Sequence, residues 1–253
     1  MHSSFKSLIR PLYVKVWKTW ERLTDRPTGR YPVAHQGIQR SGTNYLAAIL
    51  MDADYLLLNR IDPKRDDPRH KHFRWQKDKS TIKMDQRYAN DMHASRVAEV
   101  NRHANWPEGT RHVVLFRDPR DWLDGIFRWG CANNWFASEE AFVYKGMHTT
   151  FLREWDAYYT HWAELAQRDP TEVMIVRYAN LRRDPGGEIH KIDLYSGVTR
   201  EKPGDFSGQK MKVRHSKPLD VQRQKLSSPE IDELFCSPTT FDWQAYQLEG
   251  DST

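Results

Sequence analysis

Short apolar runs alternate along the chain with longer stretches in which apolar residues recur at helical spacing. The apolar runs predict buried strands at Tyr31–Gln36, Tyr55–Leu58, His112–Phe116 and Val173–Val176. The longer stretches predict helices at Thr43–Met51, Asp85–Ala104, about 149–168 and Pro185–Tyr195, and Pro119 suits the first turn of a further helix. Strands that alternate with helices indicate an α/β fold, in which helices cover both faces of a parallel β-sheet.

Two segments directly follow predicted strands, where such sheets bind ligands. Gly37–Asn44 comes after the first strand, and Arg117–Asp121 comes after the third. The carboxyl ends of parallel strands meet at one edge of the sheet, and ligands sit beyond that edge. Between these segments, Arg60–Lys79 carries eight Lys or Arg residues against four acidic residues, which predicts a charged surface loop over the site.

Composition indicates one folded unit. The 253 residues include ten Trp, eleven Tyr and ten Phe, and disordered chains generally lack so many large packing residues. No internal repeat or long linker divides the sequence, so we expect a single domain over residues 1–253. We expect no membrane-spanning helix, because no apolar stretch approaches the roughly 18 residues that one needs.

The first residues predict an amphipathic helix over residues 1–24. Apolar residues recur there at near-helical spacing, and Lys and Arg within 5–22 supply positive charge. Such a helix either packs against the body of the protein or makes a peripheral contact with a membrane. No apolar run is long enough for a signal peptide, and Cys131 and Cys236 lack the spacing of a disulfide framework or zinc site. These features favour a reducing, cytoplasmic location.

The net charge narrows the possible partners only slightly. Lys and Arg total 39 against 34 Asp and Glu, which gives +5 with neutral histidine. This balance favours anionic partners, including phosphorylated small molecules, acidic glycans, anionic lipids and nucleic acids. A nucleic-acid or anionic-glycan binding protein with a degenerate nucleotide fold is therefore one alternative, although the chain carries no recognised nucleic-acid motif.

The segment Gly37–Asn44 has the glycine spacing of a phosphate-binding loop. Such a loop lets successive backbone N–H groups wrap an oxyanion at the N-terminus of the next helix. A nucleoside-triphosphatase would carry Lys after the second glycine and then Ser or Thr for magnesium. Here Thr43 and Asn44 occupy those positions, and Arg40 lies inside the turn. The loop predicts an anion site, and a P-loop kinase with an unusual loop is the disfavoured enzymatic alternative.

Three motifs, in this order, resemble the sulfotransferases that use 3′-phosphoadenylyl sulfate. Gly37–Leu46 is similar to the family's phosphosulfate-binding loop, and Val113–Trp122 is similar to its strand and helix that bind the donor's 3′-phosphate. Val176–Pro185 resembles the segment whose tyrosine lies near the adenine. The resemblance implies a P-loop nucleoside-triphosphatase-like fold and an enzyme whose donor leaves as adenosine 3′,5′-bisphosphate.

The resemblance also implies roles for individual residues. Arg40, the loop N–H groups and the Thr43 hydroxyl would hold the phosphosulfate, Arg117 the 3′-phosphate, and two tyrosines the adenine. The residues implied for donor binding are Arg40, Ser41, Gly42, Thr43, Asn44, Tyr45, Arg117, Tyr178, Lys212 and Arg214. The last two belong to a loose counterpart of the family's basic C-terminal loop. Gly125 stands where many members have a serine that helps to hold the 3′-phosphate, so this chain departs from the family pattern at that contact.

The same residues have structural alternatives. The loop is also compatible with a tight turn whose Ser and Thr cap the following helix. Arg117 could form a strand-end ion pair with Asp118 or Asp121. Tyr45 and Tyr178 could belong to the core, as buried aromatic residues near strand ends commonly do.

The family's base is a histidine, whose ordinary pKa of about 6.5 suits proton abstraction at neutral pH. Our first candidate is His72, in the charged segment between the glycine loop and Arg117, and the alternatives are an acidic side chain, His70, and His93 or another histidine. Lys71 is a candidate second contact to the sulfuryl group. We expect no metal, because the histidines lack an i, i+4 pair with an intervening Glu and sulfuryl transfer depends on cationic donors.

These interpretations together predict in-line transfer of a sulfuryl group to a hydroxyl or amine, catalysed mainly by positioning and charge stabilisation. The acceptor is less defined, because aromatic side chains stack equally well on a phenol, a sugar or a lipid. The aromatic candidates are Phe73, Trp75, Trp129, Trp135 and Phe136, with the first two as walls of an acceptor pocket. We prefer a glycan because aromatic rings stack well on carbohydrate.

Overall fold

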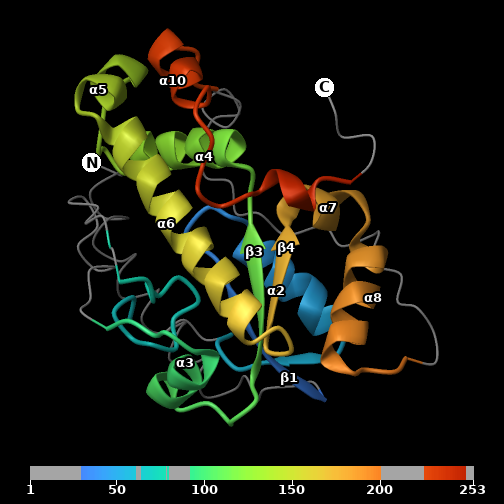
Figure 1. Cartoon of the computed structure of the whole chain (residues 1–253). Helices are drawn as coiled ribbons and strands as arrows, with labels where there is room; N and C mark the ends of the chain where they lie inside the picture. The colour runs from blue at the N-terminus through green and yellow to red at the C-terminus, as the bar shows by residue number, and fades with distance from the viewer. Residues whose placement is uncertain (1–29, 61–63, 78, 80–91, 201–224, 249–253) are drawn as a thin grey trace, which may run out of the picture.

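Four parallel strands form the sheet at the centre of the protein (Figure 1). The computed structural model describes residues 30–60, 64–77, 79, 92–200 and 225–248. The strands are β1 (Tyr31–Gln36), β2 (Tyr55–Leu57), β3 (Arg111–Phe116) and β4 (Val173–Arg177). Their order across the sheet is β2-β1-β3-β4, so β1 and β3 are neighbours although they are far apart in the sequence.

Helices cover both faces of this sheet. The helices are α2 (Thr43–Asp52), α3 (Val97–Ala104), α4 (Pro119–Ala132), α5 (Glu139–Tyr144), α6 (Met147–Arg168), α7 (Tyr178–Arg183), α8 (Pro185–Ser196), α10 (Pro229–Leu234) and the 3-10 helix η2 (Gln244–Tyr246). Residues of α3, α4, α5 and α6 share one apolar cluster, and residues of α2, α7 and α8 share another. In Figure 1, α6 crosses the front of the sheet, and α2 lies behind it.

Strand β3 is buried on both faces. Val114 and Phe116 pack into the cluster beneath α4 and α6, whereas Val113 and Leu115 pack into the cluster beneath α2 and α8. A strand with both faces covered must be apolar at successive positions, because alternate side chains enter different clusters. This explains why the sequence signal for β3 is a continuous apolar run.

Helix α6 supplies much of the aromatic packing against the sheet. Four large side chains on its buried side, Trp155, Tyr158, Tyr159 and Trp162, are completely excluded from solvent. The Tyr159 hydroxyl also donates a hydrogen bond of 2.9 Å to the Leu115 carbonyl oxygen near the end of β3. Truncating an aromatic side chain of this kind typically costs about 3–5 kcal/mol of stability. The helix is therefore a rigid support that reaches the carboxyl edge of the sheet.

The predicted α/β architecture with a parallel sheet is confirmed, and the strand bounds differ by one residue at most. The helix predicted at Asp85–Ala104 is wrong for residues 92–96, which are not helical. Helix α3 begins only at Val97, whose N–H donates to the Asp169 carboxylate at 3.0 Å. This carboxylate lies beyond the end of α6, so no local pattern could have revealed the start of α3.

The charged segment after β2 is only partly a surface loop, contrary to expectation. Residues 64–69 are mostly accessible, but His70, Lys71 and residues 73–76 are buried. Phe73 and Trp75 pack against each other, with ring centroids 4.4 Å apart, inside the cluster beneath α4 and α6. Burying these two aromatic rings stabilises the folded protein by more free energy than leaving them exposed in a polar loop would. Their predicted role as walls of an acceptor pocket was wrong.

Some predictions concern parts of the chain outside the described residues. These are the amphipathic helix at 1–24 and the basic residues Lys212 and Arg214. Among the helices that the structure describes, none combines the length and apolar character needed to cross a bilayer.

Candidate active site

The loops that follow β1 and β3 lie side by side at the carboxyl edge of the sheet. The first is Gly37–Asn44, which we call the anion loop, and the second begins at Arg117. Gly125 of α4 faces both: a Cβ added there would lie 3.5 Å from Nη1 of Arg117 and 3.8 Å from Cβ of Arg40. The two segments that resemble the donor-binding motifs therefore form one site.

The anion loop needs its glycines for backbone conformation and close packing. Gly42 has a φ of +100°, and a Cβ there would lie 2.5 Å from the ring of Tyr178. A Cβ at Gly37 would lie 2.6 Å from the carbonyl oxygen of Leu115. Arg40 adopts a left-handed conformation with a φ of 69°, which costs about 1 kcal/mol or more for a non-glycine residue. Such strain tends to collect at ligand sites.

Backbone N–H groups at the start of α2 provide hydrogen-bond donors. Those of Gly42, Thr43 and Asn44 donate to no atom among the described residues. Ser41 differs, because its N–H and its hydroxyl both donate to the Ile38 carbonyl oxygen, at 3.2 and 2.7 Å. Ser41 thus closes the turn, and both of its donors are engaged within the loop in this structure. The other three amides, at the positive end of the α2 dipole, suit an oxyanion.

Three arginines gather beside the anion loop: Arg40, Arg117 and Arg128 of α4, here called the arginine cluster. Desolvation and then the positive charges of Arg117 and Arg128 lower the pKa of Arg40. Desolvation also lowers the pKa of Arg128, although the Asp124 carboxylate opposes this shift. Like charges in proximity repel one another, so a bound polyanion would stabilise this arrangement.

Arg117 is only loosely held by acidic residues. Its Nη2 lies 3.6 Å from the Asp121 carboxylate, and its buried Nε donates to no described atom. Asp118 instead pairs with Arg177, whose Nε and Nη2 donate to the two carboxylate oxygens at 2.8 and 2.6 Å. Of the two ion pairs considered for Arg117, one is long and the other is not formed. Its guanidinium thus has donor capacity left for an anion.

The two tyrosines proposed for the adenine differ in placement. Tyr178 is half-buried at the start of α7, against Gly42, and the guanidinium carbon of Arg117 lies 5.6 Å from its ring centroid. Tyr45 is only 5% exposed and belongs to the core beneath α2 and α8. The position of Tyr178 beside both donor-binding segments agrees with the expected role, whereas Tyr45 mainly packs.

The segment His70–His72 runs along the anion loop. The Gly37 N–H donates to the Lys71 carbonyl oxygen at 3.1 Å, and His72 Nδ1 lies 2.5 Å from the Gly37 carbonyl oxygen. A carbonyl only accepts hydrogen bonds, so Nδ1 of His72 carries the proton and the lone pair resides on Nε2. His70 Nδ1 accepts a hydrogen bond of 3.0 Å from the backbone N–H of His72, and this bond orients the His70 ring. The segment therefore brings His72 to the anion loop.

Lys71 also reaches the anion loop, from the other side of the same segment. Its Nζ donates to Oδ1 of Asn44 at 2.9 Å, and its side chain is largely buried. The ammonium group thus lies at the N-terminal turn of α2. The loop lacks a lysine after its second glycine, and Lys71 brings an ammonium to the loop from a separate segment of the chain.

The environment of His72 favours its neutral form. Burial, and next the positive charge of Lys71, lower its pKa well below the ordinary value. The imidazole is consequently neutral near pH 7 and has a lone pair available on Nε2. His72 therefore presents a neutral imidazole, which can accept a proton, beside the anion loop.

Two half-buried tryptophans lie at the end of α4. Trp129 and Trp135 contact edge to face, with centroids 4.5 Å apart, and the Arg65 guanidinium lies 5.9 Å from the Trp129 ring. Arg65 belongs to the accessible part of the segment that leads to His72. Phe136 is buried in the core, stacked on Phe127, so it is not available for stacking on an acceptor.

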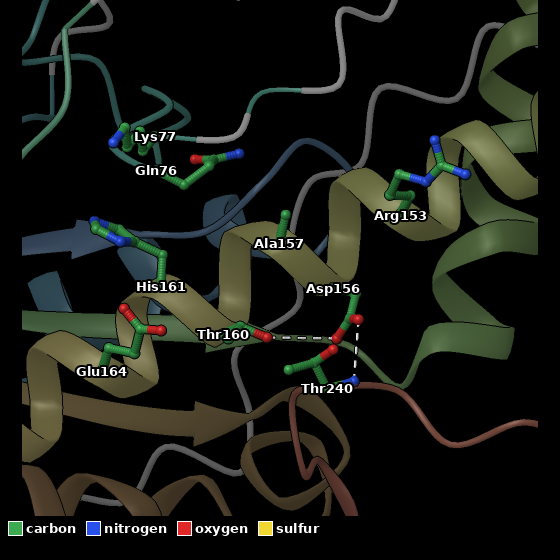
Figure 2. A pocket seen from close by; sticks show the side chains of 9 residues that line it. All are labelled: Gln76, Lys77, Arg153, Asp156, Ala157, Thr160, His161, Glu164 and Thr240. Atoms are coloured by element: carbon green, nitrogen blue, oxygen red, sulfur yellow. Dashed lines mark hydrogen bonds between the residues drawn. The ribbon is translucent and has the colours of Figure 1, made fainter.

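A separate pocket of about 370 Å³ follows the outer side of α6 (Figure 2). His161 lines it, and burial lowers the pKa of this histidine to about 4. The next residue, Trp162, packs against His112 near the start of β3, so this region lies toward the amino edge of the sheet. His93, the third candidate base, interacts electrostatically with His161 and therefore belongs to this remote region. Neither histidine is placed to serve the anion loop.

Metal ligands do not gather at the site. Within the described ranges, no group of three or more His, Cys, Asp or Glu side chains could hold a metal ion. The charge at the anion loop comes instead from the arginine cluster and Lys71.

Comparison with known proteins decides the family. The model of the sulfotransferase domain matches residues 36–246, from the end of β1 to η2. The chain belongs to the sulfotransferase family. It is thus an enzyme that transfers sulfuryl groups, and its matched region contains the anion loop, Arg117 and His72.

Two solved structures are similar to this sulfotransferase. Mouse sulfotransferase SULT7A1 complexed with PAP has 14% identity and a TM-score of 0.43, with 81% of this chain and 83% of that chain covered. A sulfotransferase from Alicyclobacillus acidocaldarius has 13% identity and a TM-score of 0.43, with coverage of 76% and 89%. A search of curated proteins found no significant match.

Sequence reasoning missed several residues of this sulfotransferase site. The sequence did contain a signal for Arg128. This residue lies one helical turn beyond Asp124 and Gly125, on the same face of α4, the helix that follows Arg117. The pairing of Asp118 with Arg177 had none, since 59 residues separate the partners. Such contacts depend on how β3 and β4 align in the sheet.

Proposed function

We propose that this enzyme transfers the sulfuryl group of 3′-phosphoadenylyl sulfate to a hydroxyl or amine of its acceptor. The observation that carries the proposal is the arrangement around Gly125, where Arg40 and Arg117 lie together beside three available amides of α2. Such a site suits a ligand with two anionic groups. The N-termini of helices and arginine side chains are the groups that proteins use for phosphate-like anions.

In this proposal each end of the donor has its own ligands. The 5′-phosphosulfate binds the N–H groups of Gly42, Thr43 and Asn44, with Arg40 and the Thr43 hydroxyl. The 3′-phosphate binds Arg117, and Arg128 adds positive charge. The adenine packs beside Tyr178, whose ring adjoins both Gly42 and Arg117. The donor would also relieve the repulsion within the arginine cluster.

His72 acts as the general base in the proposed reaction. Nε2 takes the proton from the acceptor hydroxyl or amine as the acceptor atom attacks sulfur. The bond from sulfur to the bridging oxygen breaks, its electron pair stays on the phosphate, and adenosine 3′,5′-bisphosphate leaves. Arg40 and Lys71 stabilise the charge that develops on the transferring group and the leaving oxygen. An incoming anion also raises the pKa of His72, which makes the imidazole a stronger base.

The acceptor in this proposal is a glycan. Trp129 and Trp135 form a half-buried aromatic pair beside Arg65. Arg65 belongs to the segment of the chain that leads to His72. Aromatic faces suit the apolar side of a sugar ring, and a nearby guanidinium suits an acidic or sulfated substituent. We infer that this pair, and not Phe73 or Trp75, contacts the acceptor.

Binding titrations test the donor assignment. We expect saturable, magnesium-independent binding of adenosine 3′,5′-bisphosphate, weaker binding of ATP and no comparable binding of an unrelated polyanion such as polyphosphate. Preference for ATP with magnesium would favour a kinase, and equal binding of all three would favour a general polyanion binder. Incubation with labelled donor and a panel of glycans, phenols and amines, followed by mass spectrometry, identifies the acceptor class.

A further inference from the structure

One guanidinium, that of Arg74, contacts both functional parts of the site. Its Nη1 donates to the carbonyl oxygen of His72 at 2.7 Å, and its Nη2 donates to Oε1 of Gln39 at 2.6 Å. Gln39 immediately precedes Arg40 in the anion loop. Arg74 therefore connects the backbone of the candidate base to the loop that carries the donor-binding arginine.

Glu154 of α6 fixes this guanidinium in place. Arg74 Nε donates to Glu154 Oε1 at 2.6 Å, and the two side chains are 1% and 2% exposed. The guanidinium carbon also lies 5.4 Å from the ring centroid of Tyr158, one turn along α6. A planar guanidinium with several partners has little freedom to rotate, unlike an ammonium on a flexible chain.

Other side chains of α6 form hydrogen bonds with further parts of the carboxyl edge of the sheet. The Trp155 indole N–H donates to the carbonyl oxygen of Arg117 at 3.0 Å, and the Ile38 N–H donates to the Tyr159 hydroxyl at 3.4 Å. Trp155 and Tyr159 lie next to Glu154 and one turn beyond it on α6. One helix thus contacts the segment of the base, the anion loop and the strand end that carries Arg117.

We propose that Arg74, paired with Glu154, is a positioning residue that sets the distance between His72 and the anion loop. This inference rests on the proposed function, because it assumes that the base and the donor must meet at a fixed geometry. An isolated buried ion pair is weak evidence for stability, since desolvation offsets much of the attraction. The hydrogen bonds to His72 and Gln39 give this pair a second role that a purely structural pair lacks.

Arg74→Lys tests the proposal because it keeps the positive charge beside Glu154 and removes the planar set of donors. We expect the affinity for adenosine 3′,5′-bisphosphate to fall about tenfold, since the anion loop loses its anchor at Gln39, and turnover to fall about 100-fold. Nitrogen NMR of histidine-labelled protein should show the Nδ1–H tautomer of His72 in the native enzyme and mixed tautomers in the variant. A merely structural role would leave this spectroscopic signature unchanged.

The matched control is Arg200→Lys, in another ion pair with a buried carboxylate. Arg200 pairs with Asp193 of α8 at 2.5 Å, and none of its partners among the described residues belongs to the site. This variant should retain the His72 tautomer and the nucleotide affinity of the native enzyme. If Arg74→Lys does not fold, the same measurements can be made on a double variant, Arg74→Met with Glu154→Met. This variant removes both buried charges together and so leaves neither of them unpaired.

Combined variants distinguish this inference from the proposed function. Gln39→Leu should not weaken nucleotide binding further when added to Arg74→Lys, because both changes break the same contact. A folded Arg74 variant with native nucleotide affinity and a native His72 spectrum would overturn the inference alone. Native enzyme that binds no adenosine 3′,5′-bisphosphate would overturn the proposed function, and the His72 spectrum would still report whether Arg74 orients the ring.

Discussion

Arginines at the two edges of the sheet differ in how their charge is balanced. At the carboxyl edge, Arg40 forms no ion pair with a described residue, and its arginine neighbours help to lower its pKa. Toward the amino edge, Arg200 pairs with Asp193, and this hydrogen-bonded carboxylate raises the pKa of Arg200. Asp193 also accepts a hydrogen bond of 2.7 Å from the hydroxyl of Tyr55, at the start of β2.

The difference shows how a binding site can be distinguished from a structural charge cluster. Arg40 lies beside two other arginines and has no acidic partner among the described residues, so this part of the site suits a ligand that carries negative charge. Arg200 needs no such ligand because its partner belongs to the protein. Substitutions at the two edges should therefore affect different properties, namely catalysis at one edge and stability at the other.

The largest expected effect is that of Arg40→Ala. We expect kcat/KM for sulfuryl transfer to fall about 1,000-fold or more, because a cationic donor to the transferring group is lost. Stability should change little, since removing one cation also relieves repulsion. Steady-state kinetics with an acceptor from the panel and calorimetry with adenosine 3′,5′-bisphosphate measure both effects.

Arg200→Ala is the matched control for this prediction. It leaves the buried Asp193 without its cation, which should cost about 1–3 kcal/mol of unfolding free energy while kcat/KM stays near the native value. Loss of activity in Arg200→Ala with native activity in Arg40→Ala would reverse the comparison of the two edges.

The next largest effect is expected for His72→Ala. Removal of a general base should lower kcat about 100- to 10,000-fold, and the affinity for adenosine 3′,5′-bisphosphate should stay within about twofold. His161→Ala is the control, because this histidine also has a lowered pKa but lies in the pocket along α6. Native turnover in His72→Ala would move the base to another residue, with His70 as the next candidate.

Gly42→Ala should have an intermediate effect on binding. The new methyl group would meet the Tyr178 ring, so the turn and the three amide donors must shift, and we expect nucleotide affinity to fall about tenfold. Gly109→Ala, in the turn before β3, is a control with a φ of +73°, and no neighbouring atom of the described residues lies within 4 Å of the added carbon. It should cost only about 1 kcal/mol in stability and leave nucleotide binding intact. Equal binding losses in both variants would mean that the contact with Tyr178 is unimportant.

The smallest expected effect is on the pH dependence of the unfolding free energy, through a histidine at the amino edge of the sheet. Burial lowers the pKa of His112 in β3 to about 3, so the folded protein holds a neutral imidazole where the unfolded chain would be protonated. The unfolding free energy should therefore fall as the pH drops below about 6.5, by about 1.4 kcal/mol per pH unit from this residue. His112→Gln should reduce that slope in chemical denaturation between pH 6.5 and 5. An unchanged slope would show that His112 is already protonated or accessible.

The sequence predicted the fold because the strong signals were local. The continuous apolar run of β3 and the glycine spacing of the anion loop each lie within a few residues. The alternation of strands with helices then predicted a parallel sheet. In such a sheet the anion loop and the segment that begins at Arg117 both follow strands, so both were expected at its carboxyl edge. The resemblance to sulfotransferases, and not periodicity, selected His72 as the first candidate base, and in the structure this histidine contacts Gly37 of the anion loop.

Contacts between distant segments decided the rest. The segment around Phe73 and Trp75 looked like a surface loop because it is rich in charge, yet its aromatic rings and Arg74 are buried. The partner of Arg74 is Glu154, 80 residues away, and nothing near either residue in the sequence indicates the other. Local sequence determines which elements form and which residues border the sheet edge, since hydrogen bonding and side-chain periodicity act over a few residues. Tertiary packing alone decided which charges are paired, because desolvation and Coulomb energy depend on distances that the folded chain sets.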